Sequence, residues 1–77
     1  MSTVRKLNES ALRGIYDAYM HEAFPPAELK PLAVMLRLME RGRYLCYGYY
    51  RNGRLAAYAF FYRHDSRVLL LDYFAVT

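Results

Sequence analysis

The sequence predicts an α+β domain in which one strand and two helices precede a three-stranded antiparallel meander. Three observations support this order: apolar residues at helical spacing in the first half, a change to strand periodicity from Arg43, and an Asn52-Gly53 pair between two aromatic-rich runs. Asn-Gly accepts the positive φ angles of a tight hairpin turn, so these two runs are expected to pair. The length allows one domain, residues 1–77.

The first strand is expected at residues 3–7, at a sheet edge, where Arg5 and Lys6 would discourage unwanted pairing. Asn8 or Ser10 can then cap a helix by accepting from backbone amides at its start. Apolar residues follow at helical spacing and form one stripe for packing against a core. They are Leu12, Ile15, Tyr16, Tyr19 and Ala23.

Phe24-Pro25-Pro26 is expected to end this helix, because a proline disfavours the helical conformation of the residue before it. A short turn from Pro26 to Lys30 and a second helix from Pro31 to Arg41 are predicted next. Gly42 is suited to a left-handed stop. The meander then occupies residues 44–50, 55–62 and 68–76.

The last of these strands is apolar on both sides of Asp72, which predicts a buried central strand. A single carboxylate in such a run is costly unless it is hydrogen-bonded or used in function. Because side chains alternate along a strand, Asp72 and Tyr73 are expected to face opposite sides of the sheet.

Composition restricts the setting and the partners. Apolar residues make up 56% of the chain, more than a small monomer can hide, so a homo-oligomer or further chain is expected. The net charge of +4 favours anionic ligands without specifying one. A single cysteine, Cys46, excludes an internal disulfide and a multi-cysteine metal site, and it favours the cytoplasm. No metal is expected. No stretch reaches the length of about 20 apolar residues that spans a bilayer, so no membrane partner is expected.

Four stretches resemble the N-terminal half of the GNAT superfamily of N-acetyltransferases, ending at the fourth strand of that fold. They are the helix break Phe24-Pro25-Pro26-Ala27-Glu28-Leu29, the exit Glu40-Arg41-Gly42-Arg43-Tyr44, the hairpin from Tyr49 to Ala59, and the strand Leu70-Leu71-Asp72-Tyr73-Phe74-Ala75-Val76. The last is the most specific. One departure is Ala57, where many members have glycine.

The resemblance implies transfer of an acetyl group from acetyl-CoA to an amine acceptor of unknown type. In the family, the strand resembling Leu70 to Val76 leads into an Arg/Gln-x-x-Gly-x-Gly/Ala turn that binds the coenzyme A pyrophosphate. This sequence ends before such a turn. The chain is therefore expected to be a partial domain, inactive alone, whose C-terminal half is absent or supplied by another chain.

The resemblance also assigns roles to residues. The backbone of Phe74, Ala75 and Val76 would bind the pantetheine arm and stabilise the developing oxyanion. Asp72 is the nearest carboxylate that could act as a base, and Tyr73 could hold a water or orient the acceptor.

The acceptor would be received near the corner Glu22-Ala23-Phe24. Strand tyrosines, Tyr49 among them, could line its cleft.

Simpler interpretations remain open for each of these groups. Asp72 could be a buried carboxylate satisfied by backbone or Arg donors, and the tyrosines and the corner could serve packing alone. Two other classes of function compete. The first is a module that stacks single-stranded nucleic acid, which the element order and the absence of an RNA-recognition motif disfavour. The second is a non-catalytic module that assembles with its own copy.

Overall fold

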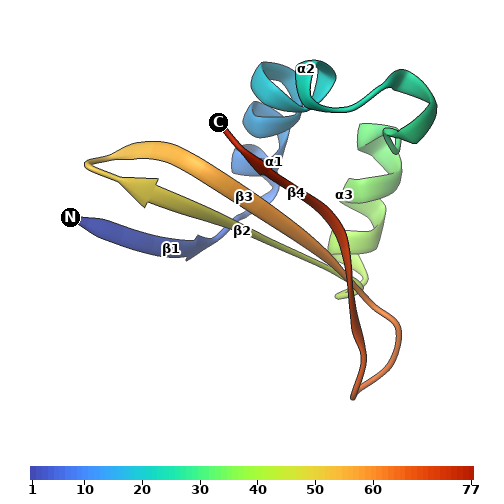
Figure 1. Ribbon diagram of the computed structural model, residues 1–77. Coiled ribbons are helices and arrows are strands. Elements are labelled where there is room, and N and C mark those ends of the chain that lie inside the picture. Colours follow the sequence, from blue (N-terminus) through green and yellow to red (C-terminus); the bar gives the residue numbers. More distant parts are fainter.

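Four antiparallel strands form one sheet in the computed structural model, which describes residues 1–77 (Figure 1). The strands are β1 (Ser2–Lys6), β2 (Tyr44–Arg51), β3 (Arg54–Arg63) and β4 (Leu69–Val76), and their spatial order follows the chain. The predicted α+β class, the meander and the position of β1 at a sheet edge are confirmed.

The helical part is more divided than the predicted pair of helices. Helix α1 (Glu9–Ile15), a π-helical turn η1 (Tyr16–Met20) and α2 (His21–Ala23) follow one another, and Asn8 caps the start by accepting from the Ala11 N–H at 2.8 Å. Phe24 is extended, as expected before a proline. A 3₁₀ turn, η2 (Pro26–Glu28), then precedes α3 (Leu32–Glu40). The predicted order of one strand, two helices and three strands is therefore confirmed only coarsely, because the first helical segment is divided into α1, η1 and α2 and a 3₁₀ turn precedes α3.

The turns adopt the geometry that their residues favour. Asn52 and Gly53 both have positive φ angles, 52° and 80°, as the predicted hairpin requires. Gly42 ends α3 with a φ of 72°. In the second hairpin, the Asp65 carboxylate accepts from the N–H groups of Arg67 and Val68, at 2.7 and 3.0 Å. These turns fix the register of the meander.

The core lies between the helices and one face of the sheet (Figure 1). Its largest fully buried side chains come from the helices and from β2 and β3: Leu12, Met20, Met35, Cys46, Tyr58 and Phe60. The opposite face of the sheet carries no helix, and we call it the open face. None of the helices combines the length and hydropathy needed to cross a bilayer.

Strand β4 is not the buried central strand that its composition predicts. It is the second edge of the sheet, and five of its large apolar side chains are exposed: Leu69, Leu70, Leu71, Phe74 and Val76. The prediction is wrong because a run that is apolar on both faces implies cover on both faces, whereas the helices cover only one.

A β-bulge in β4 sets the direction of the two residues of greatest interest. Phe60 lies opposite Tyr73 but Phe61 lies opposite Leu71, so Asp72 is the extra residue on β4. The bulge turns both Asp72 and Tyr73 toward the helical side. The prediction that they face opposite sides is therefore wrong, because alternation holds only in a regular strand.

Candidate functional site

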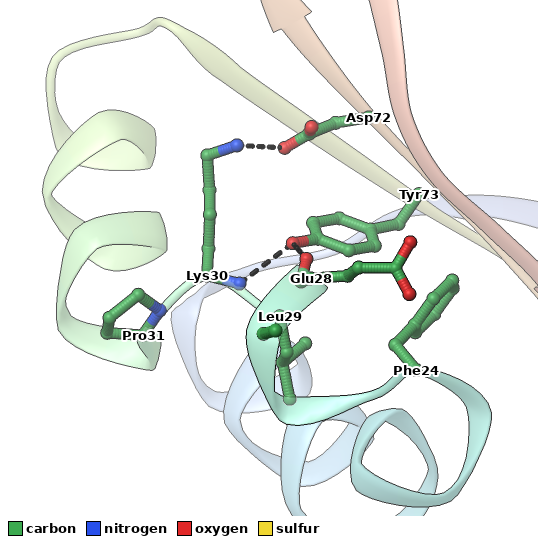
Figure 2. Close-up of a pocket in the computed structure, with 8 residues that line it drawn as sticks. Phe24, Glu28, Leu29, Lys30, Pro31, Asp72 and Tyr73 are labelled. Atoms are coloured by element: carbon green, nitrogen blue, oxygen red, sulfur yellow. Dashed lines mark hydrogen bonds and ion pairs between the residues drawn. The ribbon is translucent and has the colours of Figure 1, made fainter.

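The loop between the helices and the bulged part of β4 enclose a cavity of about 460 Å³, which we call the Asp72 cavity. The prolines after Phe24 form the loop, and the bulge supplies Asp72 and Tyr73. Figure 2 shows both side chains extending from β4 toward the segment from Glu28 to Pro31. The lining residues are Phe24, Ala27, Glu28, Leu29, Lys30, Pro31, Asp72 and Tyr73.

Tyr73 ties this loop to the sheet. Its hydroxyl donates to the Glu28 carbonyl at 2.7 Å and accepts from the Lys30 N–H at 2.8 Å. Its buried ring meets the Phe24 ring edge-on, with centroids 4.9 Å apart. The one hydroxyl proton is therefore already used in a structural bond, and Tyr73 contributes shape and loop position to the cavity.

Asp72 has two donors on a single carboxylate oxygen. Its Oδ2 accepts from Lys30 Nζ at 2.9 Å and from the Tyr44 hydroxyl, while Oδ1 has no partner within the protein. The Asp72 side chain keeps 22% of its surface exposed. One oxygen thus anchors the network, and the other is free to accept from a ligand in the cavity.

Two groups close to Asp72, the Tyr44 hydroxyl and the Cys46 thiol, keep their protons at neutral pH. Burial raises the pKa of the Tyr44 hydroxyl, and its hydrogen bond to Asp72 raises it further, so Tyr44 acts as a donor. Burial, with a smaller contribution from the negative charge of Asp72, raises the pKa of the Cys46 thiol to about 12. Cys46 is therefore not a nucleophile at neutral pH.

The predicted backbone site at Phe74, Ala75 and Val76 divides into two kinds of residue. Thr77 N–H donates to the Ala56 carbonyl of β3 at 2.9 Å, and hydrogen-bonded pairs alternate along an antiparallel ladder. Ala75, which lies opposite Tyr58, therefore bonds to β3 as well. The N–H and C=O groups of Phe74 and Val76 point instead to the free outer edge of β4.

The three predicted acceptor-binding residues lie in three different places. Phe24 lines the Asp72 cavity, whereas Glu22 lines a separate cavity of about 330 Å³ beside the end of β4. Tyr49 lines an apolar hollow of about 290 Å³ on the open face. These residues do not form one acceptor cleft.

Sequence reasoning missed Lys30, Glu28 and Tyr44 as parts of the site. The sequence predicts no more than a turn at Lys30. A lone carboxylate in an apolar strand nevertheless favours a cation as its partner, and Lys30 is one of only two lysines in the chain. Tyr44 gives no such signal, because it resembles the other strand tyrosines in the sequence.

No group of three or more His, Cys, Asp and Glu side chains gathers in a way that could hold a metal ion. Comparison with protein-family models, with curated proteins and with solved structures found no match for this chain.

Proposed function

We propose that residues 1–77 form the acceptor pocket and the acyl-donor edge of an acetyl-CoA-dependent N-acetyltransferase of the GNAT type. The observation that carries the proposal is the β4 bulge. It brings the Asp72 carboxylate into a cavity, and two residues later the backbone groups of Phe74 lie on the free outer edge of β4. Bulges occur frequently beside active sites, where they redirect a side chain.

The donor would lie along the outer edge of β4. The amides of a pantetheine arm can pair with the unpaired backbone groups of Phe74 and Val76 in the manner of an added strand. An N–H group on that edge would stabilise the oxyanion that forms when the thioester carbonyl is attacked. Ala75 has no part in this contact, because its backbone bonds to β3.

The acceptor would enter the Asp72 cavity as an ammonium ion. Asp72 Oδ1 and the Glu28 side chain supply negative charge, and the rings of Phe24 and Tyr73 supply apolar surface. Once deprotonated, the amine nitrogen bonds to the acetyl carbon, the C–S bond breaks, and the coenzyme A thiolate takes up a proton. Asp72 is the proposed acceptor of the ammonium proton, directly or through a water.

Residues 1–77 include no glycine-rich turn at a helix start that could bind the coenzyme A pyrophosphate, so they should bind the donor weakly and not turn over. A cytoplasmic location belongs to the same proposal and is supported by the single cysteine, free and buried.

Amide NMR titration of the 77-residue chain with acetyl-CoA and with S-acetylpantetheine tests the donor edge. We expect both donors to shift the Phe74 and Val76 amides with similar weak affinity, and to shift Ala75 less. Val76→Pro removes one outward N–H group without removing a hydrogen bond between β3 and β4, and it should weaken the binding of both donors. Micromolar binding of acetyl-CoA by residues 1–77 would refute the expected weak binding, and unchanged β4 amides would refute the donor edge.

A second candidate is a non-catalytic module that pairs with its own copy through β4. The observation that favours it is the contrast between the two sheet edges: β1 carries Arg5 and Lys6, whereas exposed β4 side chains are mainly apolar. Light scattering across a concentration series should then show a dimer that Leu71→Lys disrupts. A wild-type monomer at high concentration would exclude this candidate.

A further inference from the structure

Lys30 brings a primary amine of the chain itself into the Asp72 cavity. Its Nζ lies 2.9 Å from Asp72 Oδ2, and Figure 2 shows the extended side chain with its ammonium end beside Asp72. The chain has one other lysine, Lys6, which lies on β1 and takes part in no salt bridge. Lys30 is therefore the one lysine that lies against the carboxylate proposed to accept the ammonium proton.

The Lys30 amine is close to Asp72 and still open to a ligand. Its side chain keeps 36% of its surface exposed, and both residues line the cavity of about 460 Å³. The ammonium lies 5.8 Å from the centre of the Tyr73 ring, which forms an aromatic wall of the cavity. A reactive group that enters the cavity can therefore reach this amine.

The Lys30 amine also lies close to the proposed acyl-donor edge. Its partner Asp72 precedes Phe74 by two residues, which is about 7 Å along a strand. The backbone groups of Phe74 point to the free outer edge of β4, where a pantetheine arm would pair. The amine, the carboxylate and the donor edge thus lie within one short stretch of the structure.

We infer that Lys30 is an acetylation site of this chain, modified by transfer from an acyl donor that is held on the outer edge of β4. Lys30 is thereby an acceptor within the chain itself, and this role rests on the proposed acetyl transfer. Modification of a resident lysine needs no acceptor to enter and no acetylated amine to leave. One transfer per chain can therefore occur where the chain does not turn over.

The step is a single acyl transfer from a thioester. The Lys30 ammonium gives a proton to Asp72, the neutral Nζ bonds to the thioester carbonyl carbon, and the C–S bond breaks. Of the two protons that the nitrogen loses, one goes to the departing thiolate and the other passes through Asp72 to solvent. The products are a free thiol and a neutral acetyl-lysine, which no longer forms the ion pair with Asp72.

The test incubates the 77-residue chain with S-acetylpantetheine or with S-acetyl-2-mercaptoethanol, and follows acetylation of Lys30 and Lys6 by peptide mass spectrometry. Both donors carry the same thioester, but only the first has amides that can pair with β4. We expect S-acetylpantetheine to modify Lys30 at least about 100-fold faster than Lys6, a small part of what orientation contributes in intramolecular reactions. The shorter thioester should lose this preference, because no arm holds it beside Lys30.

Three variants separate the parts of this reaction. Asp72→Asn removes the proton acceptor and should slow acetylation of Lys30 by about 100-fold, with the rate at Lys6 unchanged. Val76→Pro keeps Lys30 and Asp72 in place, so it tests the donor edge without altering their ion pair, and it should slow Lys30 acetylation by S-acetylpantetheine alone. Lys6→Arg is the control and should leave the rate at Lys30 unchanged.

Equal rates at Lys30 and Lys6 with S-acetylpantetheine would overturn the inference. The same preference for Lys30 with both thioesters would also overturn it, because the selection would not depend on β4. Titration of the β4 amides separates this failure from failure of the proposed function. Shifted Phe74 and Val76 amides with equal lysine rates would exclude Lys30 as an acceptor and leave the donor edge intact, whereas unshifted amides would refute both.

Discussion

Replacing Lys30 with methionine should lower stability and raise affinity for an amine at the same time. In the native chain the Lys30 ammonium lies 2.9 Å from Asp72 Oδ2 and 5.8 Å from the centre of the Tyr73 ring. It therefore occupies part of the position that an ammonium ligand would take. Lys30→Met keeps the apolar stem and the backbone N–H that donates to Tyr73, and removes only the charge.

The expected magnitudes are modest because the pair is partly in water. The Lys30 and Asp72 side chains are 36% and 22% exposed, and exposed ion pairs contribute about 0.2–1 kcal/mol. We expect the variant to lose up to about 1 kcal/mol of unfolding free energy, which corresponds to a Tm lower by about 4–8 °C in a domain of this size. Relief of competition at Asp72 should strengthen amine binding by about fivefold.

Benzylamine is a suitable probe, since its ring can contact Phe24 and Tyr73, and affinity can be followed at the Asp72 and Tyr73 amides. Lys6→Met makes the same chemical change on β1, at the opposite edge of the sheet, and should alter neither affinity nor the Asp72 network. Asp72→Asn should weaken benzylamine binding and lower stability together. If Lys30→Met bound benzylamine no better than the wild type, the assignment of Asp72 as the amine-binding group would be wrong.

Three further outcomes are expected. Tyr73→Phe leaves the Glu28 carbonyl and the Lys30 N–H without their partner, and it should lower the unfolding free energy in urea by about 1–3 kcal/mol; an unchanged midpoint would contradict its role in holding the loop. Stability should fall as the pH rises above 9, because folding raises the pKa of the Cys46 thiol from 9.0 to about 12. Above pH 9 the unfolded chain releases this proton while the folded chain keeps it, which favours unfolding. Cys46→Ala should make that decline shallower in thermal melts across pH 8–11. Gly53→Ala forces a side chain into a φ of 80° and should cost about 1 kcal/mol by calorimetry, whereas Gly14→Ala, in open helical space, should be neutral or stabilising.

The elements that the sequence predicts well are those that local chemistry specifies. Asn8 at a helix start, Phe24 before a proline, Gly42 at a helix end and the Asn52-Gly53 turn each impose backbone angles without help from the rest of the chain. The position of β4 at an edge was not predictable in this way, because hydropathy reports how apolar a strand is and not which neighbours it has.

The candidate site was predictable only in part, for a related reason. The lone Asp72 is conspicuous in the sequence because a carboxylate is costly in an apolar run, so the sequence predicts that it has a hydrogen-bond partner. The partner itself, Lys30, lies 42 positions away and is brought close by the helix break. The bulge that joins Asp72 and Tyr73 in one cavity depends on the pairing of β4 with β3, which no pattern within β4 reveals.

That bulge also makes the site sensitive to residue count as well as to residue type. Deleting Leu71 would keep every side chain of the Asp72 cavity in the chain and close the bulge into a regular ladder. Tyr73 would stay opposite Phe60, but Asp72 would move opposite Phe61, onto the open face and away from Lys30 and Tyr44. Related chains could thus lose the site through a single codon deletion that leaves all its residues intact. Comparison of relatives for such a site should therefore count the residues between the His64-Arg67 turn and Tyr73 before it compares their identities.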